Sequence, residues 1–159
     1  MEIRIAREQD LEGILRLLVQ VNQVHANLRP DLFKGGGVKY TLESLKEKLQ
    51  VENERIYVAV EDDCVLGYVF TVIEDQEESS NRHARRAVYI DDFCVDEECR
   101  GKQIGTKLFQ FVKQEASVMG AYHITLHVWN CNPWAERFYR SLGMQPMYTA
   151  MELVLDPRS

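Results

Sequence analysis

The sequence predicts a single α/β domain with a mixed, mostly antiparallel sheet and flanking helices. Its 159 residues suit one domain with a sizeable core, and no linker or repeat interrupts residues 1–159. Strand and helix patterns alternate in the order βααβββαβαβ. The strand–helix–strand units of the C-terminal half favour parallel neighbours with a right-handed crossover, whereas a hairpin in the middle requires antiparallel ones. Together these observations indicate a mixed sheet.

The N-terminal third should form one strand and two helices. A short strand covers residues 3–6, and Asp10 is a suitable N-cap for a helix that runs to about Asn27 on an apolar 3.6-residue repeat. A proline and three consecutive glycines predict a loop at residues 28–37. Thr41 should cap the second helix.

The rest of the chain follows the same two periodicities. Residues 74–86 are polar and charged, which predicts a solvated connection rather than strand. Gly143 should end the last helix as its C′ residue. The expected strands are 56–60, 65–72, 87–95, 122–129 and 147–155, and the expected helices are 103–119 and 132–142.

Composition narrows the classes of function. Hydrophobic residues make up 45% and charged residues 28%, which is ordinary for a globular protein. A formal net charge of -6 argues against a nucleic-acid partner. The absence of a membrane-length apolar run or signal-like start leads us to expect a cytoplasmic protein. The four cysteines lack zinc-site spacing, and His123 and His127 have no evident third ligand, so we expect reduced thiols and no metal.

The most informative segment is a strand followed by a glycine-containing turn that opens a helix, at residues 89–106. A helix N-terminus carries unpaired N–H groups and a positive dipole end, so it attracts anions. Arg100 and Lys102 add positive charge. The lysine of a nucleotide-binding P-loop would have to follow the glycine directly, and the order of Gly105 and Lys107 does not allow this. A dinucleotide-binding glycine pattern is also missing.

The turn resembles the acetyl-CoA pyrophosphate motif of the GCN5-related N-acetyltransferase (GNAT) superfamily, [Arg/Gln]-x-x-Gly-x-[Gly/Ala]. Arg100 and Gly105 match its ends, while Gln103 stands where the family usually has glycine. A second family motif, Asn-x-x-Ala-x-x-Phe-Tyr-x-x-x-Gly-Phe, is similar to the segment that begins at Asn132. Its matching residues are Asn132, Ala135, Phe138, Tyr139 and Gly143, with Met144 in the place of the aromatic residue.

The resemblance, which spans residues 88–143 directly, implies a GNAT-like fold and an N-acetyltransferase that uses acetyl-CoA. It implies that Tyr139 protonates the leaving thiolate and that Asp91 is the base, directly or through water. Asp92 should face the opposite side of the strand from Asp91. His25 and Phe33 would line the acceptor pocket. The residues expected to hold the cofactor are Phe93, Cys94, Val95, Arg100, Gly101, Lys102, Gln103, Ile104, Gly105, Thr106 and Asn132, with Gln103 donating its N–H from a helical conformation.

Several acceptors and one other class of protein remain open. The first is a primary amine of a small molecule, of the polyamine, amino-sugar or aminoglycoside class. The second is a protein or peptide amine. The third is a non-catalytic acyl-CoA-binding domain, which only Gln103 favours, and an ATP-binding loop is disfavoured. The family also implies a homodimer, for which Trp129, Met144, Met147 and the last strand are possible contacts, and Trp134 should also pack at a surface.

Overall fold

The computed structural model describes residues 1–156 and forms one five-stranded sheet in the order β1-β2-β3-β4-β5. The first four strands are antiparallel, and β5 is parallel to β4. No helix within residues 1–156 has the length and apolar character needed to cross a membrane. The strands are β1 (Glu2–Ile5), β2 (Glu54–Glu61), β3 (Cys64–Gln76), β4 (Arg85–Val95) and β5 (His123–Leu126); the helices are α1 (Leu11–Leu28), α2 (Leu42–Lys48), α3 (Ile104–Val118) and α4 (Pro133–Ser141).

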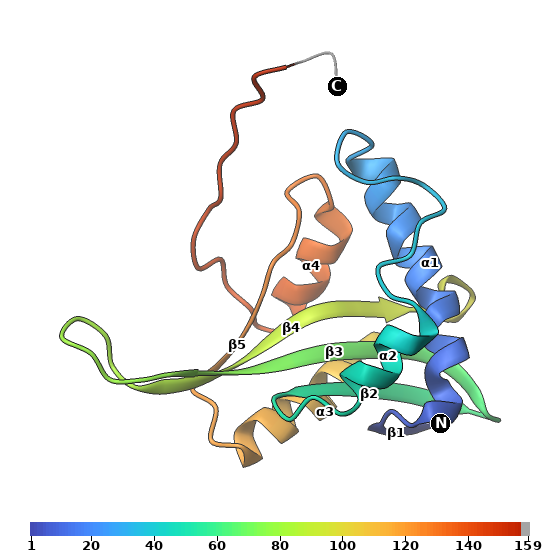
Figure 1. The fold of residues 1–159 in the computed structure, drawn as a ribbon, viewed down its shortest axis with the longest axis horizontal. Helices are drawn as coiled ribbons and strands as arrows, with labels where there is room; N and C mark the ends of the chain where they lie inside the picture. The colour runs from blue at the N-terminus through green and yellow to red at the C-terminus, as the bar shows by residue number, and fades with distance from the viewer. Residues whose placement is uncertain (157–159) are drawn as a thin grey trace.

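Helices cover both faces of the sheet, so the core has two layers (Figure 1). One layer joins α1 and α2 to inward side chains of β2 and β3, around Tyr68 and Phe70. The other joins α3 to the opposite face, around Leu108 and Val112. The alternation of buried residues along β2 and β3 supplies both layers, because successive side chains of a strand point to opposite faces. The predicted fold class is therefore confirmed.

The β3–β4 hairpin is longer than the sequence predicted. Residues 74–76 and 85–86 are strand rather than solvated connection, and they form an arm that projects from the sheet at the left of Figure 1. Asp75 lies opposite Arg86, and the two form a bidentate ion pair with N–O distances of 2.7 and 2.8 Å. Polar residues on both faces hide this strand from a pattern of alternating hydrophobicity, while cross-strand pairs stabilise it.

Local signals placed the helix ends well. The Thr41 side chain accepts a hydrogen bond from Ser44 N, and Asn132 accepts one from Ala135 N. Gly143 has φ +93°, as a C′ residue should. Asp10 precedes α1 but does not cap it; its buried carboxylate instead accepts two hydrogen bonds from Arg4, at 2.6 and 2.9 Å.

The C-terminal part departs most from prediction. β5 ends at Leu126 instead of residue 129, and residues 147–155 form no strand. Residues 145–155, called here the C-terminal arm, leave the domain after α4 (Figure 1). Strand formation needs a neighbouring edge as well as a β-rich sequence, and no other described segment pairs with this arm. The observed order is βααβββαβα.

Candidate active site

The two edges of β4 differ along its length. β3 pairs with β4 along its whole length. On the other edge, β5 pairs only with Ala87–Ile90 of β4, and the chain then turns toward α4 (Figure 1). From Asp91 to Val95 the second edge of β4 has no strand partner within residues 1–156. The backbone N–H and C=O groups on this edge are therefore available to a ligand.

An extra residue in β4 marks the point where the strands separate. Phe70 of β3 pairs with Asp92 and Thr71 pairs with Ile90, so Asp91 is the unpaired residue of a β-bulge. The prediction that Asp91 and Asp92 face opposite sides is wrong, because the bulge turns both carboxylates toward one cation. Lys39 Nζ lies 2.8 Å from Asp91 Oδ2 and 3.9 Å from Asp92 Oδ2.

Asp92 is the more deeply placed of the two carboxylates. Its side chain is only 8% exposed, and the Tyr68 hydroxyl donates a hydrogen bond of 3.1 Å to Oδ1. Burial raises the pKa of Asp92 to about 6, while Lys39 and the Tyr68 hydrogen bond act in the opposite direction. Asp91 is half-buried and accepts from Lys39 and, at 3.3 Å, from the Tyr40 hydroxyl. Asp92 can therefore exchange a proton near neutral pH.

Tyr139 projects from α4 toward the open half of β4. Its ring lies 6.1 Å from that of Phe93, edge to face, and 5.2 Å from that of Phe138. Its hydroxyl has no hydrogen-bond partner within residues 1–156. Burial, with a smaller contribution from Asp92, raises the pKa of Tyr139 above its ordinary value. The phenol is thus protonated at neutral pH and free to donate.

The predicted cofactor residues of β4 would act through the backbone. The Cys94 side chain points toward α1, where Sγ lies 3.6 Å from the Leu17 carbonyl oxygen, and burial raises its pKa to about 12. Phe93 packs against α4 instead. Asn132 already uses its side-chain oxygen to cap α4.

The turn before α3 presents a run of free N–H groups. No N–H from Arg100 to Thr106 donates to any other group within residues 1–156. Gly101 (φ +78°) and Gln103 (φ +61°) are both left-handed, which curls the backbone into a cradle. Gln103 does not have the helical conformation predicted for it. It adopts the conformation that a glycine would take, so the motif keeps its backbone shape despite the substitution.

Gly105 sets the distance between α3, α4 and β4. A Cβ at this position would lie 3.1 Å from Phe138 Cζ and 3.4 Å from Val95 Cγ2. Ile104 is buried in the core, so only its N–H faces the turn. Arg100 and Lys102 stand on the same turn, and the donor set fits a multiply charged anion such as a pyrophosphate.

Aromatic and cationic side chains gather beyond Asp91, at the other end of the open edge. His25 and Phe33 stack at 5.1 Å, and Phe33 meets Trp129 edge to face at 5.8 Å. Arg29 lies over the Trp129 ring, 5.4 Å from its centre. The structure thus brings both predicted acceptor residues to one place, and Trp129, predicted to pack at a surface, contacts Phe33. Burial, and then Lys39, lower the pKa of His25.

Several residues of the site escaped sequence reasoning. Lys39, Tyr40 and Tyr68 surround the two aspartates, but none stands in a recognisable motif. His127 bridges Tyr148 (2.5 Å) and Tyr89 of β4 (3.0 Å), which lies two residues before Asp91. Only their closeness to the bulge in the folded structure identifies these residues as part of the site. Trp134, by contrast, is largely exposed to solvent, and the guanidinium of Arg137 lies over its ring.

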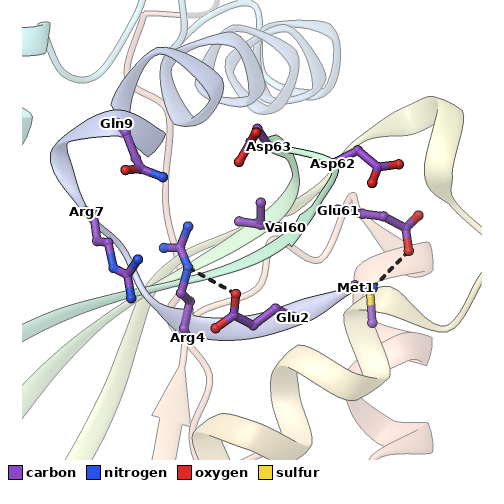
Figure 2. Close-up of a pocket in the computed structure, with 9 residues that line it drawn as sticks. All are labelled: Met1, Glu2, Arg4, Arg7, Gln9, Val60, Glu61, Asp62 and Asp63. Atoms are coloured by element: carbon purple, nitrogen blue, oxygen red, sulfur yellow. Dashed lines mark ion pairs between the residues drawn. The ribbon is translucent and has the colours of Figure 1, made fainter.

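A separate hollow of about 480 Å³ lies at the β1 edge of the sheet, far along the strand order from β5 (Figure 2). Figure 2 shows Arg4 paired with Glu2 and the Met1 amine paired with Glu61. Arg4 also binds Asp10. These charges are therefore used in pairs within the fold.

Comparison with known proteins agrees with this geometry. The tetramutant of the BH1408 protein from Bacillus halodurans superposes with a TM-score of 0.93 at 31% identity, over 98% of this chain and 100% of that one. Glucosamine-6-phosphate N-acetyltransferase from Arabidopsis thaliana superposes with a TM-score of 0.71 at 25% identity, over 98% of each chain. An aminoglycoside acetyltransferase from a soil metagenomic sample, at 20% identity, shares the fold with a TM-score of 0.71 over 98% of this chain and 96% of that one.

The sequence match to the plant enzyme covers a shorter segment of this chain than the match to the family model does. A curated Glucosamine 6-phosphate N-acetyltransferase of Arabidopsis thaliana is 32% identical over 75 residues. These residues are 47% of this chain and 48% of the plant enzyme, so the match spans about half the length of that relative. The model of the Acetyltransferase (GNAT) family matches residues 21–144, most of the chain. The match includes the bulged half of β4, the turn before α3 and all of α4. The chain therefore belongs to the acetyltransferase (GNAT) family.

Proposed function

We propose that the protein is an acetyl-CoA-dependent N-acetyltransferase that acts on a primary amine of a small molecule. One observation carries the proposal: three groups that the reaction needs follow one another along the open half of β4. The anion cradle at residues 100–106 lies after its C-terminal end, Tyr139 faces its middle through Phe93, and Asp91 and Asp92 stand at its beginning.

The residues fit acetyl-CoA in this order. The free N–H groups before α3, with Arg100 and Lys102, would hold the pyrophosphate. The unpaired edge of Phe93–Val95 would pair with the pantetheine amides as an added strand does. When bound, the cofactor supplies the acetyl thioester, whose carbonyl oxygen a backbone N–H of this edge would polarise. Asn132, which caps the start of α4, would help to hold that helix in place beside the cofactor.

The two aspartates would share the work on the amine. An alkylammonium has an ordinary pKa near 10.4 and must lose a proton before it can attack. Lys39 shows that a primary ammonium fits between the two carboxylates, so an acceptor ammonium would take its place against Asp91. Asp92, with a pKa of about 6, would receive the proton directly or through water. Tyr139 would donate its proton to the departing sulfur.

The aromatic cluster near Asp91, where the acceptor would bind, favours a small polar amine. This cluster includes Arg29, Trp129 and Phe33, and its rings suit the apolar face of a sugar. The amino-sugar enzyme among the relatives supports this class. A polyamine, an aminoglycoside and a peptide amine are the competing acceptors. The cytoplasmic location and the single-domain organisation stay predictions.

Calorimetric titration with acetyl-CoA, followed by a panel of these amines with thiol release as readout, tests the proposal. We expect binding and turnover, and we expect Tyr139→Phe to bind acetyl-CoA as the unaltered protein does while its kcat falls about 10²-fold. A protein that binds but acetylates no amine in the panel would be the non-catalytic acyl-CoA-binding domain. Absence of binding would overturn the assignment of the cradle.

A further inference from the structure

Lys39 places a primary amine of the chain itself where the proposed reaction needs its acceptor. Its Nζ lies 2.8 Å from Asp91 Oδ2 and 3.9 Å from Asp92 Oδ2. An acceptor nitrogen bound against Asp91 would occupy the position that Lys39 Nζ holds in this structure. A thioester placed to meet that nitrogen is therefore also placed to meet Lys39.

Asp92 connects this amine to Tyr139. The carboxylate faces Lys39, and its charge, after burial, helps to raise the pKa of Tyr139, which indicates that the two side chains are near each other. Phe93, the next residue of β4, contacts the Tyr139 ring at a distance of 6.1 Å between ring centres. The amine, the proposed base and the proposed acid therefore meet at one short stretch of β4.

The loop between α1 and α2, which carries Lys39, leaves the amine free to move (Figure 1). The Lys39 side chain is 46% exposed, and its backbone makes no backbone–backbone hydrogen bond within residues 1–156. Three consecutive glycines precede it, and the second, Gly36, has a φ of +74° with open space around it. A lysine side chain is a flexible four-carbon stem, so small rotations can carry Nζ away from the carboxylates.

The electrostatic surroundings keep Lys39 from reacting without help. Burial would lower its pKa, but the hydrogen bond to Asp91 and the charge of Asp92 outweigh this, and the pKa lies above its ordinary value. Lys39 is thus an ammonium at neutral pH, and a base must remove its proton before it can attack. The titratable groups that face it are His25 of α1, Tyr40 of its own loop, and Tyr89, Asp91 and Asp92 of β4.

We propose, on the basis of the proposed function, that the protein acetylates its own Lys39 when acetyl-CoA is bound and no acceptor amine is present. Asp92 takes the ammonium proton, directly or through water, and the Lys39 nitrogen attacks the carbonyl carbon of the thioester. The N–C bond forms, the C–S bond breaks, and Tyr139 donates its proton to the leaving sulfur. The products are Nε-acetyl-lysine at position 39 and the thiol of coenzyme A.

Incubation of the purified protein with acetyl-CoA, without an added amine, followed by intact-mass and peptide mass spectrometry, tests this. We expect one acetyl group per molecule, on Lys39, with a rate constant that does not depend on protein concentration. Lys39→Arg should take up no acetyl group, and Asp92→Asn should slow the modification about 10²-fold.

Lys48→Arg is the matched control. Lys48 Nζ, like Lys39 Nζ, lies 5.2 Å from the centre of the Tyr40 ring, and it pairs with a carboxylate, but that carboxylate is Glu54 rather than either aspartate of β4. This substitution should leave the rate at Lys39 unchanged. Acetylation also removes the charge of Lys39, so the modified protein should show the same shift of its acid limb to higher pH as a variant without this lysine.

Calorimetric titration and the amine panel, applied to the same preparation, separate this inference from the proposed function. Acetyl-CoA binding with Lys39 unmodified would overturn the inference, and turnover of an amine in that case would leave the proposed function standing. Equal acetylation of Lys39 and the exposed Lys46, unchanged by Asp92→Asn, would mean spontaneous chemistry. A rate constant that rises with protein concentration would mean that another copy modifies Lys39. Absence of acetyl-CoA binding would overturn the proposed function and the inference together.

Discussion

The two halves of β4 are made by one strand but serve different purposes. Residues 87–90 pair with a strand on both edges, and Val88 and Ile90 are buried against α3. Residues 91–95 keep β3 on one side and have no strand partner on the other edge within residues 1–156, where Phe93 packs against Tyr139 of α4. The first half resembles the interior of any sheet, whereas the second carries the two aspartates and the open edge, and it leads from Tyr139 to the anion cradle.

A single extra residue separates the halves. Without the bulge at Asp91, β4 would continue in register and one aspartate would point into the α3 layer. With it, both carboxylates face Lys39 and β5 departs from its neighbour. Bulges commonly re-aim side chains next to active sites. Substitutions in the open half should therefore reduce catalysis more than stability, and substitutions in the paired half should do the reverse.

The largest effect is expected at Asp92. Asp92→Asn removes the group with a pKa of about 6, so kcat should fall by about 10²- to 10⁴-fold. In the unaltered enzyme the base must be ionised, and the raised pKa means that kcat/KM should fall as the pH drops through about 6. The variant should lack this acid limb. Steady-state rates from pH 5 to 9 measure both effects.

Asp91→Asn is the matched control for that substitution. Asp91 holds the cation without being the buried carboxylate, so its loss should raise the KM for the amine more than it lowers kcat. Lys39→Met should move the acid limb to higher pH, because Lys39 lowers the pKa of Asp92. The reverse pattern, with kcat lost at Asp91 and retained at Asp92, would return the role of base to Asp91.

A change in the paired half should act on stability instead. Val88→Ala removes two methyl groups from a site that is 1% exposed, which should lower the free energy of unfolding by about 2 kcal/mol. The kinetic constants at a temperature where the variant is folded should change less than twofold. Urea unfolding followed by circular dichroism measures the first quantity. A large loss of kcat in a fully folded variant would contradict the division between the halves.

The sequence predicted the paired half better than the open half. Val88 and Ile90 alternate in a way that fixes their face, and the Thr41 and Asn132 caps and Gly143 fix helix ends through local chemistry. The bulge has no comparable signal, since an inserted residue is visible only against the partner strand. The cluster around Lys39 depends on a loop meeting β4 across 52 residues of sequence.

The strand expected at residues 147–155 shows a different limit. Its residues have the alternation and β-rich composition of a strand, but the structure leaves them without a strand partner among residues 1–156. Composition predicts that a segment can pair, whereas the edge that accepts it is a property of the folded sheet. The polar end of the β3–β4 hairpin shows the opposite case, in which Asp75 and Arg86 form strand without an apolar pattern.

The smallest effect is expected at Gln103, in the turn between the open half of β4 and α3. Its φ of +61° costs a non-glycine residue roughly 1 kcal/mol, and glycine would avoid this while losing part of the gain to the greater freedom of the unfolded chain. Gln103→Gly should therefore raise the free energy of unfolding by about 0.5 kcal/mol. Because the cradle already has the glycine-like conformation, the affinity for acetyl-CoA should change less than threefold in calorimetric titration.

Gly101→Ala should change stability in the opposite direction. The added Cβ would meet open space, so only the φ of +78° at this position penalises alanine. If Gln103→Gly instead strengthened binding by tenfold or more, the glutamine would be distorting the cradle, and the backbone of the turn would not by itself account for cofactor binding.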